Sequence, residues 1–69
     1  MLAEERFSKI LSIIESEGSA TMQELMTALD ASESTIRRDL NTMDENGLLT
    51  KVHGGAIAKK PSINTSDEN

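Results

Sequence analysis

The strongest indication of fold in this 69-residue chain is the segment Ser32-Glu33-Ser34-Thr35-Ile36-Arg37-Arg38-Asp39-Leu40. Serine is a residue type that caps the N-terminus of helices, and Ser32 stands at the start of a predicted helix. This helix runs from Glu33 to about Asn46, and Gly47 is its stop signal. Its apolar side chains recur at helical spacing and form an inward stripe of Ile36, Leu40 and Met43. The opposite side is polar, so the stretch predicts an amphipathic helix that presents two adjacent arginines to solvent.

Two further amphipathic helices are predicted upstream of this one. The first spans about Ala3 to Glu17, and Gly18 is placed to be its left-handed C-terminal cap. The second opens at Thr21-Met22-Gln23-Glu24, which has the form of a capping box, and it ends near Asp30. Their inward stripes consist of Phe7, Ile10, Leu11 and Ile14, and of Met22, Leu25, Met26 and Leu29. A leading helix followed by two helices joined by a very short turn is typical of a helix-turn-helix.

The helical period disappears after Gly47. Leu48-Leu49-Thr50-Lys51-Val52 is short, apolar and partly β-branched, His53-Gly54-Gly55 has the chemistry of a turn, and Ala56-Ile57-Ala58 follows as a second strand. The composition from Lys59 onward is that of a linker. We therefore predict a mainly α, three-helix winged helix-turn-helix domain over residues 1–58, with a small β-hairpin over 49–58 as the wing. Residues 59–69 are predicted to be a linker or disordered tail.

Composition and charge limit the function classes. The chain has no cysteine, so it has neither disulfides nor thiolate metal sites. It has no apolar run near the roughly 20 residues that span a bilayer, and its start is acidic where a signal peptide is basic. We expect a cytoplasmic protein with no membrane partner. The formal net charge is −5, yet five of the seven basic residues lie within residues 36–60, so a local basic face can still meet phosphate.

The predicted arrangement points to double-stranded DNA as the partner. If the first two helices bury their stripes against the third, the polar face of the third helix points outward. A helix of this kind fits the major groove, where each base pair shows a distinct pattern of donors and acceptors. The hairpin would then lie along the adjacent backbone or minor groove.

The same residues resemble the recognition-helix signature of DeoR-type transcriptional regulators, with Arg6 and Ile10 also where that signature expects them. The segment 47–56, Gly-Leu-Leu-Thr-Lys-Val-His-Gly-Gly-Ala, resembles the wing of the family, and the whole resemblance covers about residues 4–58. It implies the DNA-reading domain of a bacterial regulator, usually a repressor of carbohydrate-utilisation genes. It also implies a C-terminal domain, absent from this sequence, that binds a phosphorylated-sugar effector and makes the full-length protein a homo-oligomer.

The sequence departs from this family near the turn. Met26 stands where the family usually has alanine, and Asp30-Ala31 stands where glycine or asparagine followed by valine is common. Aspartate tolerates a left-handed backbone better than most residues other than glycine, so we expect the turn to survive.

Candidate DNA contacts on the third helix follow from its outward face. Arg38 is nearest the centre of that face and is the candidate for bidentate contact with guanine O6 and N7. Arg37 is more lateral and suits a phosphate, although both arginines could instead be solvated. Ser34 and Asn41 lie on the same face as base or phosphate contacts, or as ordinary surface residues.

The remaining polar residues of this helix have other expected roles. Thr35 is expected to face a phosphate from the first turn, where the helix N-terminus offers unpaired N–H groups. Ser32 is first a cap and only secondarily a phosphate contact. Asp39 is either a solvated acid or, as we favour, a residue that orients a neighbouring arginine.

In the wing, Lys51 is expected to contact DNA beside the arginines. His53 has no partners for a metal site and no nucleophile to activate, so we interpret it as a turn residue that contacts the DNA backbone. Gly54 and Gly55 are expected to supply positive φ for the turn and to let the backbone approach the sugar-phosphate. Lys59 and Lys60 either touch phosphates or begin a solvated linker.

Two other function classes remain as alternatives. A winged helix that binds protein rather than nucleic acid is favoured by the acidic total, but the exposed arginines and Lys51 argue against it. An enzyme is the more distant alternative, because nothing in the sequence assembles an acid–base pair, a nucleophile or a metal cage. We therefore expect no catalytic activity, no cofactor and no metal.

Overall fold

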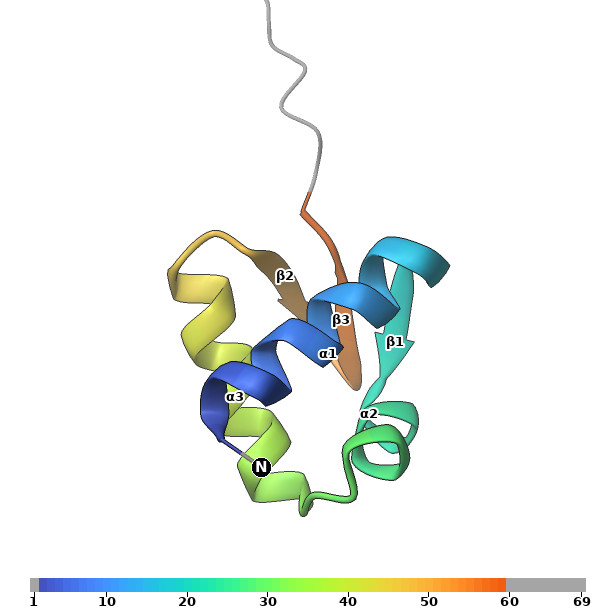
Figure 1. The fold of residues 1–69 in the computed structure, drawn as a ribbon. Helices are drawn as coiled ribbons and strands as arrows, with labels where there is room; N and C mark the ends of the chain where they lie inside the picture. Colours follow the sequence, from blue (N-terminus) through green and yellow to red (C-terminus); the bar gives the residue numbers. More distant parts are fainter. Residues whose placement is uncertain (1, 60–69) are drawn as a thin grey trace, which may run out of the picture.

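The computed structural model of the chain describes residues 2–59. Its elements follow in the order α1 (Ala3–Glu17), β1 (Ser19–Thr21), α2 (Met22–Leu29), α3 (Glu33–Glu45), β2 (Leu49–Val52) and β3 (Gly55–Ala58). α1 crosses in front of the sheet, with α3 and α2 on either side below it (Figure 1). The predicted mainly α winged helix-turn-helix is confirmed.

Local capping explains where α1 ends and where α2 begins and ends. At the start of α2 the predicted capping box forms, because Thr21 N–H donates to Glu24 Oε1 at 2.9 Å and Glu24 N–H donates to Thr21 Oγ1 at 3.0 Å. Gly18 ends α1 in the left-handed conformation, with φ of 86°. Asp30 ends α2 in the same region, with φ of 52°, so the turn to α3 keeps its geometry without glycine.

The core lies where the three helices meet the sheet. The side chains that are almost completely buried are Ile10, Ile14, Leu25, Ile36, Leu40, Met43 and Leu49. Each predicted helical stripe contributes to this core. Phe7 and Leu11 of α1, and Met22 and Met26 of α2, are only half-buried, because they pack at the edge of the cluster rather than inside it.

The hairpin predicted over residues 49–58 forms, but it belongs to a three-stranded sheet. β2 and β3 pair antiparallel, with Leu49 opposite Ala58 and Val52 opposite Gly55. β1, which the sequence analysis does not predict, pairs antiparallel with the other edge of β3, so the strand order is β1-β3-β2. The wing is therefore tied to the segment between α1 and α2.

Gly54 and Gly55 differ in their roles, which corrects the prediction that both supply positive φ. Gly54 has φ of 82° and closes the turn after His53, whereas the φ of Gly55 is not positive. Gly55 is buried in β3, and a Cβ at this position would lie 2.2 Å from the backbone oxygen of Ala20. Gly55 is thus required for the close approach of β3 to β1.

None of the helices within residues 2–59 combines the length and the apolar character that a membrane crossing requires. The linker predicted over 59–69 begins at Lys59, which is exposed and outside any helix or strand. Lys60 and residues 61–69 lie outside the described residues.

Candidate nucleic-acid interface

α3 separates a buried side from an exposed side. The buried residues are Ile36, Asp39, Leu40 and Met43. The exposed residues include Ser34, Arg37, Arg38 and Asn41. Because the apolar stripe is in the core, the helix cannot turn about its axis without exposing that stripe to water. The arginine pair is therefore held at the surface, as the sequence predicts.

Asp39 anchors the buried side of α3 through an ion pair with α1. Nε of Arg6 donates to Oδ2 of Asp39 at 2.5 Å, and Nη2 donates to Oδ1 at 3.2 Å. Asp39 is therefore not a solvated acid but pairs with an arginine, as favoured from the sequence; that arginine is Arg6 of α1 and not Arg37 or Arg38. The hydrogen bond from Arg6 to Asp39 is the main reason that the pKa of Arg6 is raised; burial opposes this effect, and the charge of Asp39 adds to it.

Three hydroxyl groups cluster at the N-terminus of α3. Ser32 Oγ accepts a hydrogen bond from Thr35 N–H at 3.3 Å, which confirms its predicted role as the cap. The same hydroxyl donates to Thr35 Oγ1 at 3.0 Å and lies 3.3 Å from Ser34 Oγ. Ser32 and Ser34 are exposed, whereas Thr35 is half-buried. Hydroxyls beside free helix N–H groups form a surface that suits an anion.

Backbone hydrogen bonds fix the wing relative to the helix-turn-helix. Met22 N–H, at the start of α2, donates to the Gly54 carbonyl in the wing turn at 2.8 Å. At the other end of β3, Ala58 N–H donates to the Gly18 carbonyl at 3.0 Å. The turn of the wing is thereby held beside α2 and within reach of the first turns of α3.

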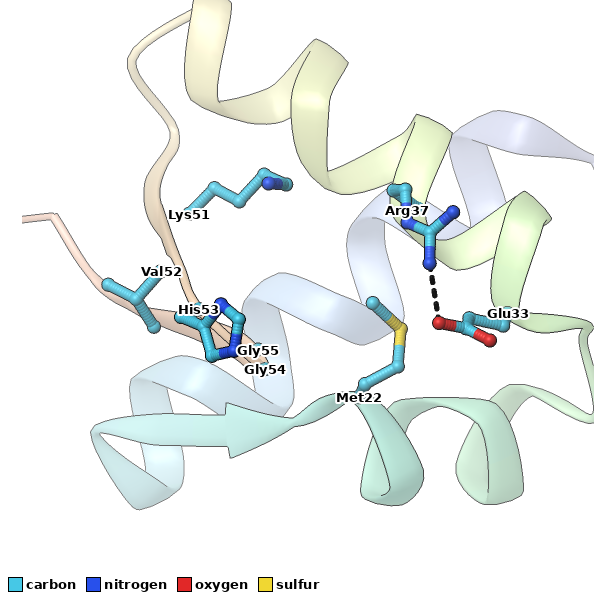
Figure 2. A pocket seen from close by; sticks show the side chains of 8 residues that line it. All are labelled: Met22, Glu33, Arg37, Lys51, Val52, His53, Gly54 and Gly55. Carbon is cyan, nitrogen blue, oxygen red and sulfur yellow. Dashed lines mark hydrogen bonds and ion pairs between the residues drawn. The ribbon is translucent and has the colours of Figure 1, made fainter.

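A cleft of about 300 Å³ separates α3 from the wing (Figure 2). It is lined by Met22, Glu33, Arg37, Lys51, Val52, His53, Gly54 and Gly55. Lys51 and His53 stand on the wing side, while Arg37 and Glu33 face them from α3 with Met22 between the two sides. Nη2 of Arg37 donates to Oε2 of Glu33 at 2.5 Å. Two cationic side chains, Arg37 of α3 and Lys51 of the wing, thus line the same cleft.

Comparisons with known proteins place the chain in a family. A family model, the DeoR-like helix-turn-helix domain, matches residues 6–62. The chain belongs to this family. The family model therefore covers most of α1, all of α2 and α3, both strands of the wing and every residue that lines the cleft of this DeoR-like domain.

Several bacterial regulators are similar to the chain. It is 52% identical over 56 residues to the HTH-type transcriptional regulator FruR of Bacillus subtilis, an alignment covering 81% of this chain and 22% of that protein. It is 42% identical over 66 residues to the lactose phosphotransferase system repressor of Lactococcus lactis, covering 91% and 26%. It is 42% identical over 60 residues to the glycerol-3-phosphate regulon repressor of Haemophilus influenzae, covering 87% and 24%.

The chain spans about a quarter of the length of these three relatives. No solved structure matches it.

Most of the predicted contact residues of this DeoR-like domain reach the surface. The exposed ones are Ser32, Ser34, Arg37, Arg38, Asn41, Lys51, His53 and Gly54. Gly55 is buried beside β1, so it lines the cleft but offers little surface to a ligand. Within residues 2–59 no group of three His, Cys, Asp or Glu side chains is placed to hold a metal ion.

Sequence reasoning missed three residues that line the cleft, Met22, Glu33 and Val52. The spacing of Glu33 and Arg37, four residues apart on one helix, is the signal that predicts their ion pair. The position of Met22 beside the wing depends on the unpredicted strand β1, so no local pattern indicates it.

Proposed function

We propose that this DeoR-like domain binds double-stranded DNA in a sequence-specific manner, with α3 in the major groove and the β2–β3 hairpin as the wing. The observation that supports this most strongly is the orientation of α3. Its apolar stripe and Asp39 are buried, while Arg37 and Arg38 are exposed, and Arg37 lines the same cleft as Lys51 of the wing.

The two classes of contact have different tasks. Arg38, near the centre of the exposed face, is assigned to a guanine edge, which it contacts through two N–H donors. Other residues are assigned to the phosphates at the edges of the DNA groove. They are Arg37, Lys51, His53 and the hydroxyls of Ser32 and Thr35. Phosphate contacts set affinity and position, whereas base contacts set sequence preference. Ser34 and Asn41 lie beside Arg38 and are assigned to bases or phosphates.

The regulatory role of the whole protein is also part of the proposal. The relatives are named as transcriptional regulators, among them the lactose phosphotransferase system repressor and the glycerol-3-phosphate regulon repressor. We propose that this chain is the DNA-reading domain of a cytoplasmic repressor of carbohydrate genes. A further domain would bind a phosphorylated sugar and pair two DNA-reading domains on repeated half-sites, which strengthens binding through effective concentration.

Fluorescence anisotropy with a labelled duplex of random sequence tests the proposal. A single domain that binds through phosphate contacts is expected to have a nonspecific Kd of about 10⁻⁴–10⁻⁶ M at physiological salt and to bind more tightly as salt is lowered. The double substitution Arg37→Ala/Lys51→Ala should weaken binding, whereas Lys9→Ala, at an exposed position on α1, should not. Absence of binding at low salt would contradict the proposal and favour a protein-binding winged helix.

A further inference from the structure

Glu33 is an acid placed among the proposed DNA contacts. It is the first residue of α3 and lines the cleft together with Arg37, Lys51 and His53. A carboxylate beside a DNA backbone is repelled by every phosphate, whatever the base sequence, because the duplex carries a dense negative charge. The proposed function assigns no DNA contact to Glu33. A separate reason is therefore needed for an acidic side chain at this surface.

The ion pair with Arg37 does not by itself supply that account. The Glu33 and Arg37 side chains are 57% and 54% exposed, and solvent screens such pairs so strongly that they add little to stability. In the structure the pair orients the Glu33 carboxylate, because Nη2 of Arg37 donates to Oε2. Within residues 2–59 the other oxygen, Oε1, accepts no hydrogen bond. The carboxylate therefore has one oxygen available to accept a hydrogen bond from a ligand.

The chemistry of base edges selects the group that this oxygen can meet. An ionised carboxylate accepts hydrogen bonds and donates none. In the major groove guanine presents the acceptors N7 and O6, thymine presents O4 and its methyl group, and adenine presents the acceptor N7 beside its amino group. Cytosine presents the donor N4 without an adjacent acceptor. Cytosine is thus the base whose edge repels the carboxylate least.

We propose that Glu33 determines sequence specificity by accepting, through Oε1, a hydrogen bond from the N4 amino group of a cytosine. This inference rests on the proposed DNA binding, in which the N-terminal residues of a recognition helix contact base edges. Arg37 braces the carboxylate from its other side. The same negative charge weakens binding to duplexes that offer no amino group at that position. Glu33 therefore favours the site that contains this cytosine and disfavours other sequences.

Selection from a library of randomised duplexes tests this assignment. The 69-residue chain, Glu33→Gln and the control Glu15→Gln are each used to select duplexes at low salt, and the bound sequences are determined. Glu15 is a matched control because it is an exposed acid on α1 that does not line the cleft. Because Glu33 is also exposed, the substitution is expected to leave the folded state intact, which a thermal melt of each variant checks.

The original chain and Glu15→Gln should both enrich cytosine at one position of the site. Glu33→Gln should lose that enrichment by about tenfold, the discrimination typical of one good base contact, because its amide also donates and can pair with the acceptors of the other bases. It should also bind random duplex more tightly, because the negative charge is gone. Equal enrichment by Glu33→Gln, weaker binding of Glu33→Gln to every duplex, or enrichment of another base at that position by the original chain would overturn the role of Glu33. If the original chain enriches no sequence at all, the proposed function itself fails, and the inference fails with it.

Discussion

Nε of Arg6 lies 2.5 Å from Oδ2 of Asp39, in an ion pair that spans 33 residues of sequence and joins α1 to the buried side of α3. Asp39 follows Arg38 directly, but one helical step of about 100° places the two side chains on different sides of α3. Asp39, which anchors α3, and Arg38, which is assigned to DNA, are therefore neighbours in sequence but lie on different sides of the helix. The ion pair and the apolar stripe together fix which residues of α3 face the solvent.

Substitution of Asp39 by alanine is expected to destabilise the fold. The Asp39 side chain is 4% exposed and its removal leaves the Arg6 guanidinium without that acceptor. Because the Arg6 side chain remains 21% exposed and can be hydrated, we expect a loss of about 2 kcal/mol, typical of a hydrogen bond to a charged group. Urea denaturation monitored by circular dichroism measures this loss.

The double substitution Arg6→Met/Asp39→Leu is the control for that measurement. It removes both charges and keeps apolar volume at the contact, so it should be more stable than Asp39→Ala. A double variant as unstable as the single one would show that the packing around the pair, and not the unmatched charge, causes the loss.

Substitution of Gly55 by alanine tests the role that the structure gives this residue. The added methyl group would meet the Ala20 carbonyl at 2.2 Å, a contact with backbone that cannot be relieved by a side-chain movement. We expect a loss of roughly 1–3 kcal/mol, as for other overpacked sites. At Gly54 an added methyl group would meet open space, but φ is 82°. Gly54→Ala should therefore lower the free energy of unfolding by about 1–2 kcal/mol through backbone strain alone.

The stability of β1 in the two variants distinguishes the roles of Gly54 and Gly55 further. Hydrogen exchange should show lost protection at the β1–β3 ladder in Gly55→Ala and retained protection there in Gly54→Ala. If both variants keep β1 protected, the close approach at Gly55 is not what holds this strand.

The helices could be predicted from the sequence because their signals are local. A stripe such as Ile36, Leu40 and Met43 is visible within a few turns, and caps such as Ser32 and Thr21 stand next to the helices that they begin. The left-handed conformation of Asp30 also follows from residue type and position alone. For the same reason the exposed face of α3, with its arginines, could be predicted without coordinates.

The features that could not be predicted depend on contacts between distant segments. β1 has three residues, too few to show a strand period, and it exists because it pairs with β3 at the other end of the chain. Asp39 looks like a surface acid on its own helix, since its partner Arg6 belongs to α1. Gly55 looks like a turn residue beside Gly54 until the position of Ala20 is known.

Arg38→Ala is expected to reduce sequence discrimination without affecting the fold. If Arg38 makes the guanine contact, its loss should lower the preference for a selected site over random duplex by roughly 1–3 kcal/mol. Parallel titrations of the two duplexes measure the ratio. Unchanged discrimination, with a normal thermal melt, would show that Arg38 is not the base contact.

Lys51→Ala is expected to weaken binding equally for all sequences. A lysine that neutralises one phosphate releases its counterions, so its loss should reduce the slope of log K against log salt by about 1. The ratio of selected to random affinity should stay constant. A change in that ratio instead of the slope would assign Lys51 to a base.

The central claim, that α3 and the wing together contact the duplex, is tested most directly by nuclear magnetic resonance. ¹⁵N-labelled chain is titrated at low salt with the selected duplex, and the backbone amide shifts are followed. We expect shifts in residues 32–41 and 51–54, with little change around Ile13, Ser19 and Glu24, which line a separate cleft between α1, β1 and α2. Shifts confined to that second cleft, with α3 unchanged, would contradict the central claim.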